Sequence, residues 1–291
     1  MKWGIVFSST SCPDPERAAA LGELAEEAGF ESLWAPEHVV IPVDYEPLYQ
    51  ASPTGRLDRL ASSGVPDPLI WFAYVAARTT RIRFGTGVVI LPEHKPVAYA
   101  KTCATLATLS QGRFMLGVGV GWCREEYEAL DEPWPDRGRR CDEYIAVLRA
   151  LWSQPEAAYD GRFVRFRPVQ SDPKPPGGTI PIVIGGDSPA AAQRAGRIGD
   201  GYFPAIFPTE RVWTDLPPLI EHVRSAAVDA GRDPSAVEIT SGGVRTVEGA
   251  KWFAEQGVER LTVAVRSRSV PEMRDELLRF GDEVIGPSAT L

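Results

Sequence analysis

The sequence predicts a single (β/α)8 TIM barrel with insertion loops at its C-terminal face. Short apolar runs alternate with amphipathic stretches, and this alternation can be followed through eight times along the 291 residues. Such a pattern is typical of parallel strands joined by crossover helices. Because α/β barrels of this length commonly form one unit, we expect residues 1–291 to be one domain.

The eight apolar runs give the expected strands. In chain order they are Lys2–Phe7, Glu31–Ala35, Ile82–Ile90, Arg113–Val118, Ile180–Ile184, Gly201–Pro204, Val237–Ser241 and Arg260–Val265. The expected helices begin at Asp14-Pro15 and Pro189 and otherwise lie near Pro68–Arg78, Val97–Ser110, Arg140–Trp152, Thr209–Ala230, Val247–Gln256 and Pro271–Val284. Asp14 and Ser188 each precede a proline, which is the N-cap pattern of a helix start. Gly29, Gly112 and Gly231 are expected to end helices.

Three long connections are expected as insertions, near residues 39–65, 122–140 and 153–179. In these barrels the catalytic and binding residues lie mainly on the loops that follow the strands. Val39–Val65 is rich in proline, glycine and serine and carries Tyr45 and Tyr49, which favours a lid or substrate loop. In the third, Asp160-Gly161 predicts a hairpin turn and an insertion over the barrel.

Composition and charge exclude several classes of partner. The net charge of −8, without a basic block, disfavours nucleic acid and anionic membranes. The first apolar stretch is too short for a signal peptide, so we expect a cytoplasmic protein. No metal site is expected, because the cysteines form no CxxC and the histidines are not spaced as a metal pair. Cys123 follows a glycine-rich turn but has no evident base, so a nucleophilic role is disfavoured.

A phosphate-binding turn is predicted where Ile184 leads through Gly185, Gly186 and Asp187 to the helix that starts at Pro189. The unsatisfied N–H groups and the dipole of a helix start attract an anion, and glycines let it approach. The alternative is a tight turn without a ligand.

Two other glycine-containing runs suggest a cofactor nearby. Gly85-Thr86-Gly87-Val88 interrupts an apolar strand, which often marks a bulge or close ligand approach, although tight packing inside the barrel is equally compatible. Gly117–Trp122 does not match GxGxxG, because its third glycine comes one position early. We expect it to be a strand-end loop near a cofactor, with Trp122 either in the core or at the site.

Glu37 and His38 place a carboxylate and an imidazole at the functional end of the second strand. Histidine titrates near neutrality, so His38 can give or take a proton, while Glu37 could orient it or contact the cofactor. The alternative is a hydrogen-bonded loop histidine. His94 and His222 are weaker candidates.

Taken in order, these segments resemble the luciferase-like monooxygenase superfamily and, within it, the coenzyme F420-dependent oxidoreductases. The resemblance is carried end to end by Ala28–His38, Gly85–Val88 with Ala104–Leu106, Gln111–Phe114 into Gly117–Trp122, and Ile182–Asp187 with Gly199–Gly201. It implies hydride transfer with F420, a deazaflavin, and a non-prolyl cis peptide at Gly87–Val88 behind the cofactor ring. It makes Glu37 and His38 the catalytic pair beside that ring. The implied cofactor-binding residues are Glu37, Thr86, Gly87, Val88, Ile90, Val120, Gly121, Trp122, Ile184, Gly185, Gly186 and Asp187.

One difference from the pattern of this family leaves the substrate unidentified. Sugar-phosphate dehydrogenases of this branch carry a catalytic glutamate where Trp122 stands, so the expected substrate is an unidentified small organic molecule. The first alternative is an FMN-dependent luciferase-like monooxygenase that uses reduced flavin and oxygen. The second is a non-catalytic flavin- or deazaflavin-binding protein. The resemblance also favours a homodimer.

Overall fold

The computed structural model describes residues 1–49, 52, 54–57, 64–204 and 211–291. Among these residues, nine strands build the central sheet, and two short ones form a separate hairpin. The central strands are β1 (Lys2–Val6), β2 (Ser32–Ala35), β3 (Arg83–Thr86), β4 (Val89–Ile90), β5 (Phe114–Gly119), β8 (Ile182–Gly185), β9 (Gly201–Phe203), β10 (Glu238–Gly242) and β11 (Arg260–Ala264).

These strands close into an all-parallel barrel, as the sequence predicts. Neighbours pair in the order β1, β2, β3, β5, β8, β9, β10 and β11, and β11 pairs again with β1. The strand expected over Ile82–Ile90 is divided at Gly87 and Val88, and both of its parts, β3 and β4, pair with β5. The ring therefore has eight positions, and the carboxyl ends of all its strands meet at one mouth.

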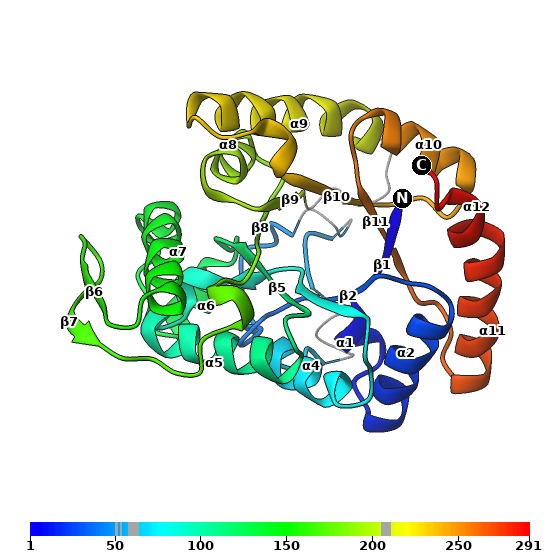
Figure 1. The fold of residues 1–291 in the computed structure, drawn as a ribbon, viewed down its shortest axis with the longest axis horizontal. Helices are drawn as coiled ribbons and strands as arrows, with labels where there is room; N and C mark the ends of the chain where they lie inside the picture. Colours follow the sequence, from blue (N-terminus) through cyan, green and yellow to red (C-terminus); the bar gives the residue numbers. More distant parts are fainter. Residues whose placement is uncertain (50–51, 53, 58–63, 205–210) are drawn as a thin grey trace.

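Helices surround the barrel (Figure 1). The longer ones are α2 (Pro15–Glu27), α4 (Pro68–Ala76), α5 (Pro96–Leu109), α7 (Arg137–Ser153), α8 (Pro189–Ile198), α9 (Arg211–Asp229), α10 (Val247–Glu255) and α11 (Val270–Phe280). The shorter ones are α1 (Ser8–Ser11), α6 (Arg124–Ala129), α12 (Gly286–Ser288), the 3-10 turns η1 (Leu91–Glu93), η2 (Pro176–Gly178) and η3 (Pro234–Ala236), and the π-helical turn η4 (Gly281–Ile285). The predicted start of α9 at Thr209 lies outside the described residues.

Local side-chain chemistry sets several helix ends. The Asp14 carboxylate accepts a hydrogen bond from the Arg17 N–H at 2.9 Å, and the Ser188 hydroxyl accepts one from the Ala191 N–H at 3.2 Å. Both N-cap predictions are thus confirmed. In the part of the chain that the structure describes, no helix is long and apolar enough to cross a membrane.

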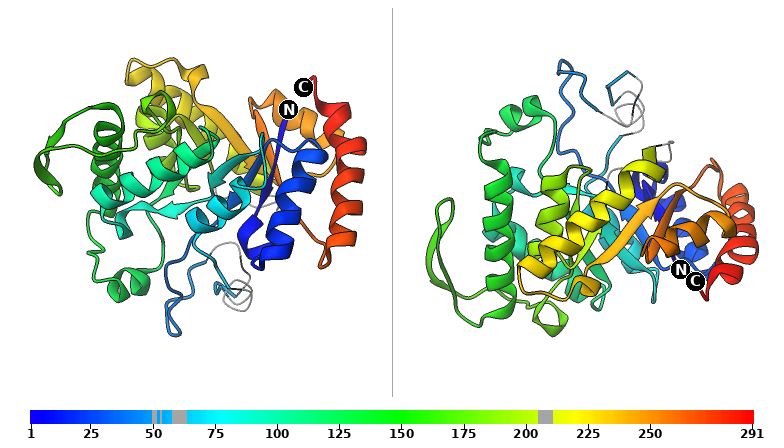
Figure 2. Two further views of the ribbon diagram at one scale, coloured as in Figure 1. Left: turned by 60° about the horizontal axis from the view of Figure 1, so that its bottom comes forward. Right: turned by 90° about the horizontal axis from the view of Figure 1, so that it is seen from above.

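The predicted hairpin exists but does not cover the barrel. Strands β6 (Ala157–Asp160) and β7 (Arg165–Val169) pair antiparallel, and Figures 1 and 2 show them on the outer side of α7. Glu143 of α7 accepts hydrogen bonds from the backbone N–H groups of Phe163 and Val164 at 2.8 and 2.7 Å. The expected position over the barrel is therefore wrong, because these contacts hold the hairpin against α7.

Candidate active site at the barrel mouth

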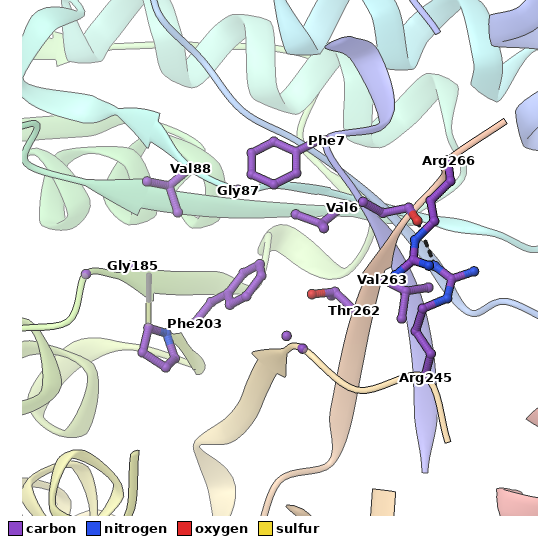
Figure 3. A pocket seen from close by; sticks show the side chains of 15 residues that line it. Val6, Phe7, Gly87, Val88, Gly185, Phe203, Arg245, Thr262, Val263 and Arg266 are labelled. Carbon is purple, nitrogen blue, oxygen red and sulfur yellow. Dashed lines mark hydrogen bonds between the residues drawn. The ribbon is translucent and has the colours of Figure 1, made fainter. Parts of the chain in front are cut away.

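A cavity of about 320 Å³ opens at the carboxyl ends of the strands (Figure 3). Its described lining residues come from the ends of strands that are far apart in sequence. They are Val6, Phe7, Gly87, Val88, Gly185, Gly186, Phe203, Pro204, Gly242, Gly243, Arg245, Thr262, Val263, Ala264 and Arg266. A concave, mainly apolar site at this end of a barrel is typical of ligand and active sites.

Val88 forms a bulge in the cavity wall between β3 and β4. The Gly87–Val88 peptide is cis, as the resemblance implies. The Val88 side chain packs against two glycines on neighbouring strands. A Cβ atom on Gly185 would lie 2.5 Å from Val88 Cγ1, and one on Gly119 would lie 2.8 Å from Val88 Cγ2. These glycines therefore leave room for the bulge, which gives the Gly117–Trp122 pattern a packing role.

The Gly185–Gly186 turn lies against Val88, where β8 leads into α8. Both glycines line the cavity, and the Tyr202 hydroxyl donates a hydrogen bond to the Gly186 carbonyl at 2.8 Å. Ile184 is buried in the core, while Asp187 is partly buried and outside the described lining. The turn thus brings bare backbone to the cavity three residues before α8 starts at Pro189, and a glycine turn that leads into a helix start is the arrangement that attracts a phosphate.

His38, just beyond the end of β2, pairs with an acid that the sequence analysis did not select. Its Nδ1 atom lies 2.7 Å from the Glu126 carboxylate, and the two side chains are 8% and 0% exposed. Glu37 does not orient His38. Its carboxylate instead accepts a hydrogen bond from the Ile90 N–H at 2.9 Å and lies 3.0 Å from His94 Nε2. Glu37 and His38 thus reach different partners although they are neighbours in the chain.

A signal for Glu126 was present in the sequence. It lies on α6 three residues after Cys123 and beside Tyr127, both of which are buried. The i, i+3, i+4 spacing places all three on one helix face. An acid on an otherwise apolar helix face, just after a barrel strand, is a reasonable candidate for a site residue.

Further buried acids lie near this pair. The Glu93 carboxylate is buried, and neither oxygen has a hydrogen-bond partner among the described residues. Burial, followed by the charges of Glu126 and Glu37, raises the pKa of Glu93 to about 9. Burial disfavours the charged form of His94, but the hydrogen bond to Glu37 and the charges of Glu37, Asp67 and Glu132 together outweigh burial and raise the pKa of His94. Glu93 is therefore neutral and His94 more readily protonated than an ordinary histidine.

Trp122 joins His38 to the long loop that follows β2. The Trp122 ring centroid lies 6.2 Å from that of His38, 5.9 Å from Tyr45 and 5.6 Å from Tyr49. The part of the expected lid at residues 50, 51, 53 and 58–63 lies outside the described residues. Cys123, next to Trp122, is buried, which raises the pKa of its thiol to about 11 and disfavours a nucleophilic thiolate.

The structure brings only part of the expected set to the cavity. Gly87, Val88, Gly185 and Gly186 line it, whereas His38, Glu37, Thr86, Ile90, Val120, Gly121, Trp122, Ile184 and Asp187 are outside its described lining. Thr86 is buried, and its hydroxyl bonds to the Gly117 backbone at 2.7 and 2.8 Å. A Cβ atom on Gly121 would lie 2.9 Å from Ile90 Cγ2, so these two residues pack together.

Several lining residues were missed by the sequence analysis, which looked mainly at long loops. Phe7, Phe203, Arg245 and Arg266 follow or end the strands β1, β9, β10 and β11. Their position at strand ends was the available signal. Phe7 also has φ +58°, an uncommon conformation for a bulky residue, and its ring faces the cavity (Figure 3).

Comparison with known proteins identifies the family to which the chain belongs. The family model described as luciferase-like monooxygenase matches residues 3–251. The chain belongs to this family. A Mycobacterium tuberculosis protein described as uncharacterized is 33% identical over 276 residues, which cover 94% of each chain. An F420-dependent glucose-6-phosphate dehydrogenase of Nocardia farcinica is 32% identical over 235 residues, covering 77% of this chain and 62% of that protein.

A solved structure has the same fold. The coenzyme F420-dependent tetrahydromethanopterin reductase of Methanopyrus kandleri matches with a TM-score of 0.75 and 16% sequence identity, covering 98% of both chains. Family and relatives together identify this luciferase-like protein as an enzyme, an oxidoreductase built on a TIM barrel.

Proposed function

We propose that the protein is an F420-dependent oxidoreductase that transfers a hydride between the deazaflavin and a small organic molecule. The observation that carries the proposal is the cavity wall in which the Val88 bulge packs beside the Gly185–Gly186 turn. This cavity lies in a chain that is 32% identical to a relative named for its dependence on F420.

The residues present fit such a cofactor. Val6, Val88 and Phe203 offer apolar surface for a planar ring, and Gly87 has no side chain to obstruct it. Gly185 and Gly186 would hold a phosphate at the start of α8 through backbone N–H groups. When bound there, the deazaflavin supplies the carbon that gives or takes the hydride.

His38 is proposed to move the proton that accompanies the hydride. When its Nδ1–H donates to Glu126, the other ring nitrogen, Nε2, is left to accept or donate a proton. The buried carboxylate also fixes the direction of the ring. Glu37 remains a proposed site residue that acts through His94 and the β4 backbone.

The FMN-dependent monooxygenase remains the alternative, because the same apolar wall and phosphate turn suit a flavin and the family description names monooxygenases. A non-catalytic binding protein would use the apolar wall and the phosphate turn but would have no need of the His38–Glu126 pair. We also propose a cytoplasmic homodimer that acts on a small molecule. The net charge of −8 supports the absence of nucleic-acid and membrane partners.

Anaerobic turnover tests the proposed reaction. Reduced F420 is mixed with the protein and a panel of small electron-poor carbonyl and alkene compounds, and the absorbance of oxidised F420 is followed. We expect protein-dependent oxidation without oxygen. Turnover only with reduced FMN and oxygen would instead assign the protein to the monooxygenases.

A further inference from the structure

The charged side chains in the described lining of the cavity are all positive. Among the described lining residues the charged side chains are those of Arg245 and Arg266, although the chain as a whole carries a net charge of −8. In Figure 3 the two guanidinium groups lie side by side, on the other side of the cavity from Val88 and Gly185. This wall is therefore chemically distinct from the apolar wall proposed for the cofactor.

Arg245 has its hydrogen-bond partners within the protein. It donates to the Ala264 carbonyl and to the Glu276 carboxylate, both at 2.8 Å. Glu276 also accepts from the backbone N–H groups of Arg266 and Ser267, each at 3.0 Å, and from the Ser267 hydroxyl. The Glu276 carboxylate thus balances the charge of the Arg245 guanidinium. Its remaining hydrogen-bond acceptor sites are taken up by the loop at Arg266 and Ser267.

The Arg266 side chain is left without such a partner. It is exposed, and its guanidinium has no hydrogen bond or ion pair to the residues that the structure describes. Glu276 holds the Arg266 backbone, so this free guanidinium is kept beside Arg245 at the cavity. Two positive charges share one negative charge there, and the excess attracts an anion.

We propose that Arg266, supported by Arg245, binds a carboxylate or phosphate group of the substrate. The assignment to the substrate rests on the proposed function, in which the Gly185–Gly186 turn across the cavity already takes the cofactor phosphate. A guanidinium binds either anion through two parallel N–H donors, which fixes direction as well as affinity. The substrate class is therefore a small organic acid or phosphate ester whose reacting carbon faces the cofactor wall.

Calorimetric titration of the F420-loaded protein tests this assignment. Inorganic phosphate and succinate are each titrated into wild type, Arg266→Gln and the matched control Arg268→Gln, at constant ionic strength. Arg268 is exposed and outside the cavity lining. Loss of a charged hydrogen bond should weaken anion binding by about 10- to 100-fold in Arg266→Gln and leave Arg268→Gln unchanged. Equal anion binding in all three proteins, or none in wild type, would overturn the proposal.

A second arm separates the substrate from the anionic tail of the cofactor. The affinities for F420 and for its deazaflavin core without phosphate and tail are compared in wild type and Arg266→Gln. We expect Arg266→Gln to leave both unchanged. If it weakens F420 alone, the arginines bind the tail and the substrate assignment is wrong. If wild type binds no F420, the proposed function fails, and phosphate titration of the cofactor-free proteins still decides whether Arg266 forms an anion site.

Discussion

His38 and Glu126 are the residues on which the proposed proton transfer depends. The pair is almost fully buried and is joined at 2.7 Å, so the ring is held in one orientation before any substrate arrives. Preorganisation of this kind avoids the free energy of arranging the acid or base during the reaction.

Replacing His38 should therefore lower the turnover number far more than the cofactor affinity. We expect His38→Ala to reduce kcat by about 10²- to 10⁴-fold, the usual contribution of a general acid or base. Glu126→Gln should also lower kcat, by up to about 10⁴-fold, because the amide no longer fixes the tautomer of the histidine or stabilises its charged form. Steady-state kinetics with reduced F420 measures both.

His222 provides the matched control for these variants. It is exposed on α9, away from the barrel mouth, and His222→Asn should behave like wild type. Wild-type kcat in His38→Ala would show that the proton comes from another group.

Glu93 makes the folded state sensitive to alkaline pH. Its pKa is about 9 in the folded protein against an ordinary value of 4.5. Folding therefore takes up a proton there between those pH values, and stability falls as the pH rises through this window. Glu93→Gln should raise the free energy of unfolding at pH 8 by about 1 to 3 kcal/mol, because glutamine is neutral at every pH and folding no longer has to take up a proton at this position.

Urea unfolding at pH 5 and pH 8 measures this effect. The gain should be small at pH 5 and absent at both pH values in Glu128→Gln, which alters an exposed acid on α6. A gain that does not depend on pH would show that the charge of Glu93 is not its cause.

A single residue could be predicted where its position after a barrel strand was enough to select it. His38 was selected because it lies just beyond the end of a barrel strand, and its role in proton transfer stays a prediction. Its partner was not selected, although the apolar Cys123 and Tyr127 share a helix face with Glu126 and so distinguish it from Glu125 and Glu128. The alternative in which Glu37 orients His38 is wrong, because these neighbours in sequence reach different partners.

At the scale of elements, the bulge between β3 and β4 organises the cavity. Val88 leaves the line of the strand and fills space that glycines on β5 and β8 keep open. Packing between strands thus explains a glycine pattern that resembles a nucleotide-binding motif.

A side chain at Gly185 should disturb this packing. In Gly185→Ala the new Cβ would lie 2.5 Å from Val88 Cγ1, so we expect a loss of about 1 to 3 kcal/mol in the free energy of unfolding, as for other overpacked sites. Val88→Ala should restore much of it, because the clashing atom is removed. A urea-unfolding double-mutant cycle gives the coupling energy. Additive effects of the two substitutions would contradict the packing described here.

Most elements were predictable because apolar runs, N-cap residues and helix-ending glycines agree with one another along the chain. The division of the strand over Ile82–Ile90 was foreseen only as a bulge. The place of the β6–β7 hairpin was not predictable, because it depends on Glu143, far from the turn that marks the hairpin in sequence.

At the scale of the whole molecule, the site exists only because the barrel closes. The β1–β11 and β3–β5 pairings bring Phe7, Val88, Gly185 and Arg266 to one mouth. The repeated alternation of strand and helix predicts that closure, but it cannot say which strand-end side chains meet across the cavity. The Arg245–Arg266 wall was overlooked for that reason.

Cofactor choice is the central claim, and equilibrium titration of the cofactor-free protein with F420 and with FMN tests it most directly. Fluorescence of each cofactor is followed in wild type and in Gly185→Ala, whose added methyl group would displace Val88 in the cavity wall proposed for the cofactor. We predict saturable binding of F420 at least about tenfold tighter than FMN, a difference of about 1.4 kcal/mol, and weaker binding in the variant. Tight binding of FMN without binding of F420 would contradict the account.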